Sequence, residues 1–208
     1  MQLLLLGGTQ FVGRWIAELA RDRGHQVTLF HRGRTNPDLF PDLDHVLGDR
    51  DGGLDGLHGR RWDAAVDVSG YVPRIVDESC SLLADAVEHL TFISTGAVYA
   101  SSAEPGQDED AHLAELDDPA VEEINGATYC GLKVLCERVV EARFPGGNLL
   151  LRPGVIVGPH DPTDRFTYWP VRLASLSTVL APPVDATLEF TDVRDLATFT
   201  LDAIERRL

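Results

Sequence analysis

The sequence alternates short, continuously apolar runs with longer stretches of helical periodicity. Continuous apolar runs are typical of strands buried on both faces of a parallel sheet. Helices between such strands, joined by short connections, favour right-handed crossovers. The pattern therefore predicts an α/β fold with a doubly wound, Rossmann-like parallel sheet and helices on both faces. The expected strands are residues 3–6, 27–30, 45–47, 64–68, 90–94 and 149–151, and the expected helices are 11–23, 72–88, 127–143, 166–176 and 192–206.

Length and composition fit one globular domain. At about 150 residues per domain, a chain of 208 residues predicts a single domain over residues 1–208. The first apolar run follows an uncharged Met-Gln and leads into glycines, so it resembles neither a signal peptide nor a membrane span. We therefore expect a cytoplasmic protein without membrane association. Its three cysteines lack C-x-x-C spacing, which predicts reduced thiols and no metal site.

The charge balance is strongly acidic. Eighteen basic and 33 acidic residues give a formal net charge of −15, which disfavours nucleic acid as a partner because no basic patch compensates. Part of the charge lies in an acidic segment, residues 104–123, which contains no Lys or Arg. We interpret it as a solvated loop, with an interaction patch as the less favoured alternative. Its acids are Glu104, Asp108, Glu109, Asp110, Glu115, Asp117, Asp118, Glu122 and Glu123.

A glycine-rich turn joins the first strand to the first helix. At such a turn, free backbone N–H groups and the helix dipole can hold a pyrophosphate. Gly7 lets the chain turn, and Gly13 lets helix and strand approach closely. Gln10 stands where a dinucleotide-binding turn usually has its middle glycine, so a phosphate must tolerate its side chain or accept a hydrogen bond from its amide. The expected cofactor contacts are Gly7, Thr9, Gln10, Phe11, Val12 and Gly13.

The turn after the second strand predicts which dinucleotide is preferred. No carboxylate follows that strand to hold a ribose diol, whereas His31, Arg32 and Arg34 do follow it. Two guanidinium groups can pair with a 2′-phosphate, so NADP is favoured over NAD. The alternative is that both arginines are solvated loop charges. Asp49, after the third strand, can accept a hydrogen bond from the adenine amine, although Gly-Asp is also a plain turn signal.

Two further elements carry groups for proton transfer. Helical spacing places Tyr129 and Lys133 on one face. A phenol titrates near pH 10, and a neighbouring cation lowers that pKa toward the range of a useful proton shuttle. Thr95, at the carboxyl end of the fifth strand, can hydrogen-bond a substrate oxygen. Thr95 and its neighbour Ser94 could also be ordinary turn hydroxyls.

Taken together, these motifs resemble the extended short-chain dehydrogenase/reductase family, the NAD(P)-dependent epimerase/dehydratase group. The resemblance implies that Thr95 takes the family's Ser/Thr role, that Tyr129 is the acid/base and that Lys133 binds the ribose and lowers the phenol pKa. It also implies that Ser69 and Gly70 line the cofactor and that Pro153 and Val155 lie against the nicotinamide. The matching segments are residues 7–13, 48–49, 94–99, 129–133, 151–159 and 190–197.

The resemblance also implies an activity and an assembly. We expect an NAD(P)-dependent oxidoreductase, epimerase or dehydratase acting on a small hydroxy or keto substrate, with nucleotide sugars among the candidates. Arg165 would hold a substrate anion, with an ordinary surface loop arginine as an equal alternative. His160 is a weaker candidate, because a lone loop histidine is more often solvated. Family members run on for about another hundred residues, so residues 154–208 read as a remnant of the substrate-binding region. Helices 72–88 and 127–143 have apolar residues on more than one side, which predicts a homodimer through them.

Two other functions are weighed against this one. A catalytically silent sensor or partner protein would keep the dinucleotide site without turnover. RNA binding, by analogy with the chloroplast stem-loop-binding branch of the family, is disfavoured by the charge.

The turn after the second strand yields a test of cofactor choice. We expect tighter binding of NADPH than of NADH, and Arg32→Ala should reduce the difference. One charge-assisted phosphate contact changes affinity about tenfold to a hundredfold. Fluorescence titration measures both affinities, and equal affinities in the unmutated protein would refute the preference.

Overall fold

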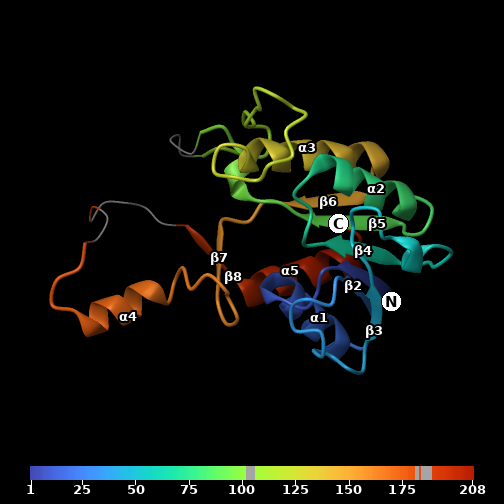
Figure 1. Ribbon diagram of the computed structural model, residues 1–208, viewed down its shortest axis with the longest axis horizontal. Helices are drawn as coiled ribbons and strands as arrows, with labels where there is room; N and C mark the ends of the chain where they lie inside the picture. Colours follow the sequence, from blue (N-terminus) through green and yellow to red (C-terminus); the bar gives the residue numbers. More distant parts are fainter. Residues whose placement is uncertain (102–105, 181–182, 184–188) are drawn as a thin grey trace.

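A computed structural model describes residues 1–101, 106–180, 183 and 189–208. Its centre is a six-stranded parallel sheet in the order β3-β2-β1-β4-β5-β6 (Figure 1). This order confirms the doubly wound sheet. The order in which the chain adds strands to the sheet reverses between β1 and β4. Every strand predicted for this sheet is present. The strands are β1 (Gln2–Leu6), β2 (Gln26–His31), β3 (Asp44–Leu47), β4 (Ala64–Asp67), β5 (His89–Ile93) and β6 (Asn148–Leu151).

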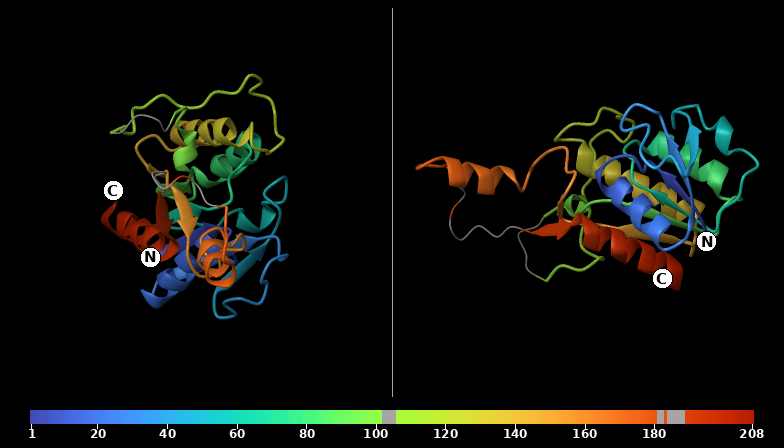
Figure 2. Two further views of the ribbon diagram at one scale, coloured as in Figure 1. Left: turned by 90° about the vertical axis from the view of Figure 1, so that its left-hand side faces the viewer. Right: turned by 90° about the horizontal axis from the view of Figure 1, so that it is seen from below.

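Helices cover both faces of this sheet. Figures 1 and 2 show α2 (Pro73–Leu83) and α3 (Tyr129–Arg143) on one face, and α1 (Phe11–Asp22) and α5 (Val193–Arg206) on the other. The first strand shows why its apolar run is continuous. Leu4 and Leu6 pack into the core beneath α2 and α3, whereas Leu3 and Leu5 pack beneath α1 and α5.

Helix α2 ends at Leu83, five residues before the predicted end. Beyond the helix, the amide of Ala86 donates to the carbonyl of Leu83, and the carbonyl of Ala86 accepts a hydrogen bond from the amide of Trp62. That contact ties the turn after α2 to the start of β4. Among the described residues, no helix is long and apolar enough to cross a lipid bilayer.

A small second sheet was not predicted from the sequence. Strands β7 (Val155–Val157) and β8 (Phe190–Asp192) pair in parallel, with Val155 opposite Phe190. Three-residue strands are too short to show a periodic signal. Between them, α4 (Tyr168–Ser175) projects from the body of the molecule and buries none of its residues (Figure 1). That residues 154–208 belong to a substrate-binding region stays a prediction.

Several of the apolar residues that suggested a homodimer are covered within the chain. Val76 and Leu83 of α2, and Leu132 and Val140 of α3, are each at most 1% exposed. Of the residues described in these two helices, no large hydrophobic side chain is exposed. Four others are half-buried, namely Ile75, Leu82, Leu135 and Val139. The two helices thus keep some partly accessible apolar residues, and the homodimer through them stays a prediction.

A buried ion pair joins the loop after β3 to the end of β4. The Arg50 guanidinium donates from Nη1 to Asp67 Oδ1 at 2.8 Å and from Nη2 to Oδ2 at 2.7 Å. The Asp67 side chain is 1% exposed. Ser69 donates its backbone N–H to the same carboxylate, and Ser79 accepts from Arg50 Nε. Because a buried charge is costly without a partner, this pair fixes the loop after β3 to the sheet.

Removing one partner of this pair should destabilise the fold. We expect Arg50→Met to lower the free energy of unfolding by about 3–5 kcal/mol, because Asp67 is left buried and uncompensated. Replacing Asp67 with Leu as well should recover most of that loss. Urea denaturation measures the effect. Arg143→Met is the control, since Arg143 and Asp77 are each 43% exposed and such a pair contributes at most about 1 kcal/mol. Equal losses at the two arginines would contradict the prediction.

Candidate active site

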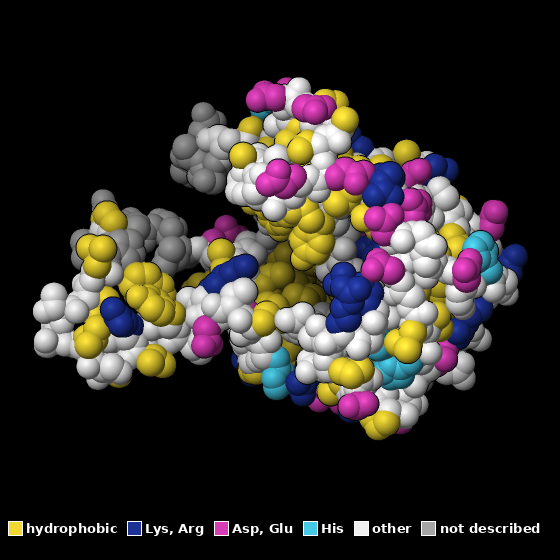
Figure 3. Space-filling model, viewed as in Figure 1, with side chains coloured by type: hydrophobic (Ala, Val, Ile, Leu, Met, Phe, Trp, Pro, Cys, Tyr) yellow, Lys and Arg dark blue, Asp and Glu magenta, His cyan; other side chains and the backbone are white. Residues whose placement is uncertain are grey.

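A cavity of about 720 Å³ opens at the carboxyl ends of the central strands, where the strand order reverses. Figure 3 shows it as a hollow with hydrophobic side chains at its floor and Lys or Arg side chains beside it. Ligands of open α/β sheets bind at such a place. The structure brings most of the predicted site residues to this cavity: Gly7, Thr9, Gln10, Phe11, Val12, Gly13, His31, Arg32, Arg34, Asp49, Ser69, Ser94, Tyr129, Lys133 and Arg165.

The glycine-rich turn needs its glycines for steric reasons. Gly7 has φ +114°, and a Cβ there would lie 2.4 Å from Val68 Cγ2. A Cβ on Gly13 would lie 2.6 Å from the backbone nitrogen of Gly8. Gln10 is extended and makes no side-chain cap on α1. The first amides of α1 are therefore available to an anion in the cavity.

Three predicted residues lie outside the cavity lining. Pro153 uses its carbonyl to accept a hydrogen bond from the Gly96 amide, and Val155 belongs to β7. The neighbouring residue Ile156 lines the cavity in their place. The ring of His160 lies 6.1 Å from that of Trp15 on α1. That Pro153 and Val155 contact the cofactor and that His160 contacts the substrate therefore stay predictions.

Two others lie directly behind the lining. Thr95 makes a side-chain hydrogen bond with Tyr129 and also accepts from the amide of Ala97. Gly70 contributes its carbonyl, which accepts from Lys133. Thr95 thus interacts with Tyr129, and Gly70 with Lys133, the two residues of α3 that line the cavity. Neither lines the cavity itself.

Lys133 is the only lysine in the sequence, beside 17 arginines. It is 3% exposed, and its Nζ donates to the carbonyl oxygens of Gly70 at 2.8 Å and Ile93 at 2.9 Å. The Phe92 ring centroid lies 4.1 Å from Nζ. Burial lowers the pKa of Lys133 from 10.5 to about 8, against the opposing charge of Asp67. An arginine could not be tuned in this way, because its pKa stays above about 12.

The surroundings of Tyr129 shift the pKa of its phenol. Burial raises the pKa of its phenol above 10, and the hydrogen bond from Thr95 and the charge of Arg165 only partly oppose that rise. Lys133 is not among the groups that lower it. Two carbonyl groups hold the Lys133 ammonium. That Lys133, together with a bound nicotinamide, lowers the phenol pKa stays a prediction.

Several residues of the site were not found from the sequence. The Tyr71 ring lies 6.3 Å from that of Tyr129 and 5.3 Å from Lys133 Nζ. Ile124, at the end of the acidic segment, also lines the cavity. Tyr71 directly follows Ser69-Gly70, so its place after the fourth strand was a usable signal. Ile124 offered none, because its position depends on how a long loop returns to α3.

Ser94 has a feature that points to a ligand. It is 6% exposed and lines the cavity. In the part of the chain that the structure describes, its Oγ and Arg14 Nε are the two buried side-chain polar atoms without a hydrogen-bond partner. A buried hydroxyl is normally paired. A group bound in the cavity would supply the missing partner.

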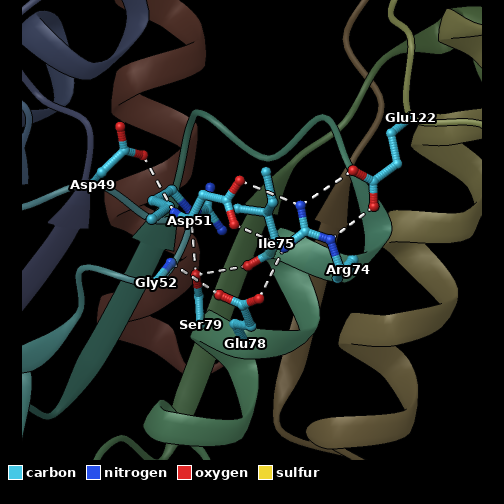
Figure 4. A network of polar contacts seen from close by, with 9 residues as sticks. Asp49, Asp51, Gly52, Arg74, Ile75, Glu78, Ser79 and Glu122 are labelled. Atoms are coloured by element: carbon cyan, nitrogen blue, oxygen red, sulfur yellow. Dashed lines mark hydrogen bonds and ion pairs between the residues drawn. The ribbon is translucent and has the colours of Figure 1, made fainter.

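The acidic segment is a loop, as predicted, but one of its acids is paired. Figure 4 shows Arg74 of α2 between Asp51, Glu78 and Glu122, at 2.8, 3.0 and 2.8 Å. The contact holds the end of the segment against the loop after β3. Leu116 also packs against Gly131 of α3. Residues 106–123 therefore lie on the body of the molecule, whereas Glu104 falls outside the described residues.

Within the described residues, no group of three or more His, Cys, Asp or Glu side chains is arranged to hold a metal ion. The thiols of Cys80 and Cys136 are buried, which raises the pKa of each to about 12. The described cysteines are free. Nothing in this arrangement supplies a reactive thiolate.

The fold is shared with solved structures of UDP-sugar 4-epimerases and of an enzyme in complex with NAD⁺. The NAD⁺ complex of the Bordetella bronchiseptica enzyme WbmH has a TM-score of 0.77 at 19% identity, over 98% of this chain and 72% of that one. UDP-glucuronic acid 4-epimerase from Bacillus cereus, in complex with NAD, has 0.73 at 16%, over 99% and 74%. UDP-N-acetylglucosamine 4-epimerase from the same organism has 0.72 at 16%, over 99% and 75%. These likenesses establish the fold.

A curated relative is similar in sequence. Chloroplast stem-loop binding protein of 41 kDa b from Arabidopsis thaliana is 24% identical over 154 residues, which is 64% of this chain. The chain spans 41% of the length of that relative. No protein-family model matches the sequence.

The buried lysine can be observed directly. We expect the Lys133 ammonium to titrate with a midpoint near pH 8, because burial favours the neutral amine. The side-chain ¹⁵N resonance reports this without ambiguity, since only one lysine is present. Lys133→Met should remove the resonance and leave that of the α-amino group. A midpoint near 10.5 would show that the ammonium is solvated.

Proposed function

We propose that this chain binds a nicotinamide dinucleotide in the cavity and transfers hydride to or from a small hydroxy or keto substrate. The observation that carries the proposal is one cavity lined by the glycine cradle of Gly7 and Gly13, by Tyr129 and Lys133, and by the unpartnered hydroxyl of Ser94. The shared fold supports it, since three neighbours are named as complexes with NAD.

The residues present fit such a cofactor. The glycines let the turn pack closely against Val68 and Gly8, and the first amides of α1, which no Gln10 side-chain cap occupies, would hold a pyrophosphate. Asp49 and Ser69 line the cavity on either side of Arg50. Asp49 would accept from the adenine amine, and Lys133 would meet the ribose. Residues outside the lining, Pro153 and Val155, have no part in this proposal.

The proposed preference for NADP rests on two guanidinium groups. Arg32 and Arg34 line the cavity and are exposed. Neither has a hydrogen bond or ion pair with any residue that the structure describes. In a chain with a net charge of −15, two arginines left unpaired at one end of the cavity are available to a 2′-phosphate. NAD, the cofactor named for the neighbours, is the alternative.

The chain's own residues would manage the proton. When bound, the nicotinamide supplies the hydride acceptor or donor. In the reducing direction, the neutral phenol of Tyr129 would give the proton of its Oη–H to the carbonyl oxygen of a keto substrate as hydride reaches the carbonyl carbon, which leaves an alcohol and a phenolate. Thr95 steadies the phenolate through its hydrogen bond, and Ser94 offers a second hydroxyl to the substrate oxygen or the cofactor. The carbonyl and alcohol forms of the substrate would thus interconvert by transfer of one proton and one hydride.

Arg165 supports a class of substrate. It lines the cavity with Tyr71 and Tyr129, and its charge opposes the rise that burial causes in the pKa of both phenols. It has no ion-pair partner among the described residues. A substrate that carries an anion, such as the diphosphate of a nucleotide sugar, would complement it. His160 is directed elsewhere and is left out.

The competing functions make different demands. A silent sensor would bind the dinucleotide and leave Tyr129 without a role. The curated relative is named for binding stem loops, but the net charge of −15 disfavours a polyanion here. Retention on RNA at low salt would favour that function instead.

Replacing the phenol separates these functions. Tyr129→Phe should abolish turnover while cofactor affinity stays within a few-fold, because Tyr129 acts on the substrate proton. Lys133→Met should weaken both. Cofactor reduction on addition of nucleotide sugars, followed by absorbance, measures turnover, and fluorescence titration measures affinity. Full activity of Tyr129→Phe would refute the assignment. Dinucleotide binding without turnover in the unmutated protein would favour the sensor.

A further inference from the structure

Two histidines are hydrogen-bonded to each other beside the proposed cofactor turn. His31 ends β2 and His45 lies on β3, and the register places their side chains on the same face of the sheet. His31 Nε2 lies 2.8 Å from His45 Nδ1. The Gly33 amide donates to His31 Nδ1 at 3.1 Å, and His45 Nε2 lies 2.9 Å from the carbonyl oxygen of Phe40. All four ring nitrogens are therefore engaged.

The groups at the two ends of this row of hydrogen bonds, the Phe40 carbonyl and the Gly33 amide, fix the direction of every bond in it. The Phe40 carbonyl can only accept, so His45 carries its proton on Nε2 and accepts at Nδ1. His31 then donates from Nε2 and accepts at Nδ1, where the Gly33 amide can only donate. Both rings are neutral in this arrangement. A further proton on either ring sets two donors against each other, at the Gly33 amide or between the rings.

The surroundings favour the neutral pair. His31 is 8% exposed, and burial together with His45 lowers its pKa below 6.5. Among the described residues, no carboxylate bonds to either ring. The charged groups nearby are Arg32 and Arg34 on the same turn, Arg21 of α1 over the Phe40 ring, and Asp42, which lies 3.9 Å from Arg21. Asp44 bonds to Thr28 and Arg60 on the opposite face.

The pair holds the turn that carries the two unpaired arginines. Gly33, between Arg32 and Arg34, has φ +69°, and its amide stands at one end of the row of hydrogen bonds through the two histidines. Farther along, Asn36 Nδ2 donates to the carbonyl of Thr9 at 2.8 Å. The segment from β2 to β3 is thus fastened to the glycine-rich turn in the middle and to the histidine pair at both ends.

We propose that His31 and His45 form a neutral, one-directional hydrogen-bonded pair that positions Arg32 and Arg34 for a phosphate on the ribose 2′ position. The proposal rests on the dinucleotide function proposed above. In this proposal, His31 holds the Gly33 amide and His45 holds His31. Both are positioning residues for the choice of cofactor. Neither ring has a nitrogen left for the cofactor.

Paired dinucleotide titrations at pH 8 test the positioning role. NADPH and NADH differ only in the 2′-phosphate, so a general folding defect lowers both affinities. We expect His31→Leu and His45→Leu to weaken NADPH binding about fivefold and to leave NADH within twofold. His31→Asn should retain the preference, because an Asn side chain accepts from the amide two residues on. Equal losses for both dinucleotides, or no rescue by Asn, would overturn the proposal.

Ring nitrogen NMR tests the pair itself, without any ligand. We expect ¹⁵N shifts to show Nε2–H and bare Nδ1 on both rings at neutral pH. The Gly33 amide should be protected from hydrogen exchange above pH 6.5 and lose protection as the pH falls through the lowered His31 pKa. In His31→Asn that protection should persist at acidic pH. A charged ring at neutral pH, or an unprotected Gly33, would refute the pair.

The two experiments keep the failures apart. If the unmutated protein binds neither dinucleotide, the proposed function fails and the 2′-phosphate role fails with it. The NMR measurement still decides whether the pair exists. If both dinucleotides bind with equal affinity while the NMR pattern is as expected, only the role in cofactor choice is overturned.

Discussion

The buried ammonium group of Lys133 links the helices to the sheet at the point where the cavity forms. Removing an ammonium from water is costly unless other groups replace its hydration. Here the carbonyl oxygens of Gly70 and Ile93 do so, and they follow or end neighbouring strands β4 and β5. Helix α3 is thereby held against the strand ends, which places Tyr129 over the cavity. The third donor of the ammonium is the one that the proposed ribose contact would use.

The loops around the cavity are fastened before any ligand arrives. Arg50 ties the loop after β3 to Asp67, and Arg74 ties the same loop to the acidic segment. Asn36 joins the segment after β2 to the glycine-rich turn. Binding a flexible ligand to a rigid site loses less conformational entropy than ordering both partners. The geometry therefore suits a long cofactor that must contact several loops at once.

The distribution of paired and unpaired arginines gives the cavity a local positive charge. Ten of the 17 arginines lie in ion pairs between described residues, including the half-buried Arg152 with the buried Glu137. Arg32, Arg34 and Arg165 line the cavity and have no such partner among the described residues. In an acidic protein, three such guanidinium groups at one cavity attract an anionic ligand locally, while the net charge disfavours polyanions. A small dinucleotide and an anionic substrate satisfy both conditions.

The sequence by itself determined the large sheet, its main helices and the residues of the glycine-rich turn. Those features are encoded locally, because continuous apolar runs require burial on both faces and glycine permits contacts that any Cβ would block. Only the tertiary structure decided which side chains face the cavity. Val155 and His160 lie outside the cavity lining, Tyr71 and Ile124 lie within it, and Ser94, a predicted candidate, has an unpartnered hydroxyl. Burial also raised the pKa of Tyr129, and packing paired His31 with His45. Burial and hydrogen bonding between residues distant in the chain depend on packing, and no local pattern in the sequence records them.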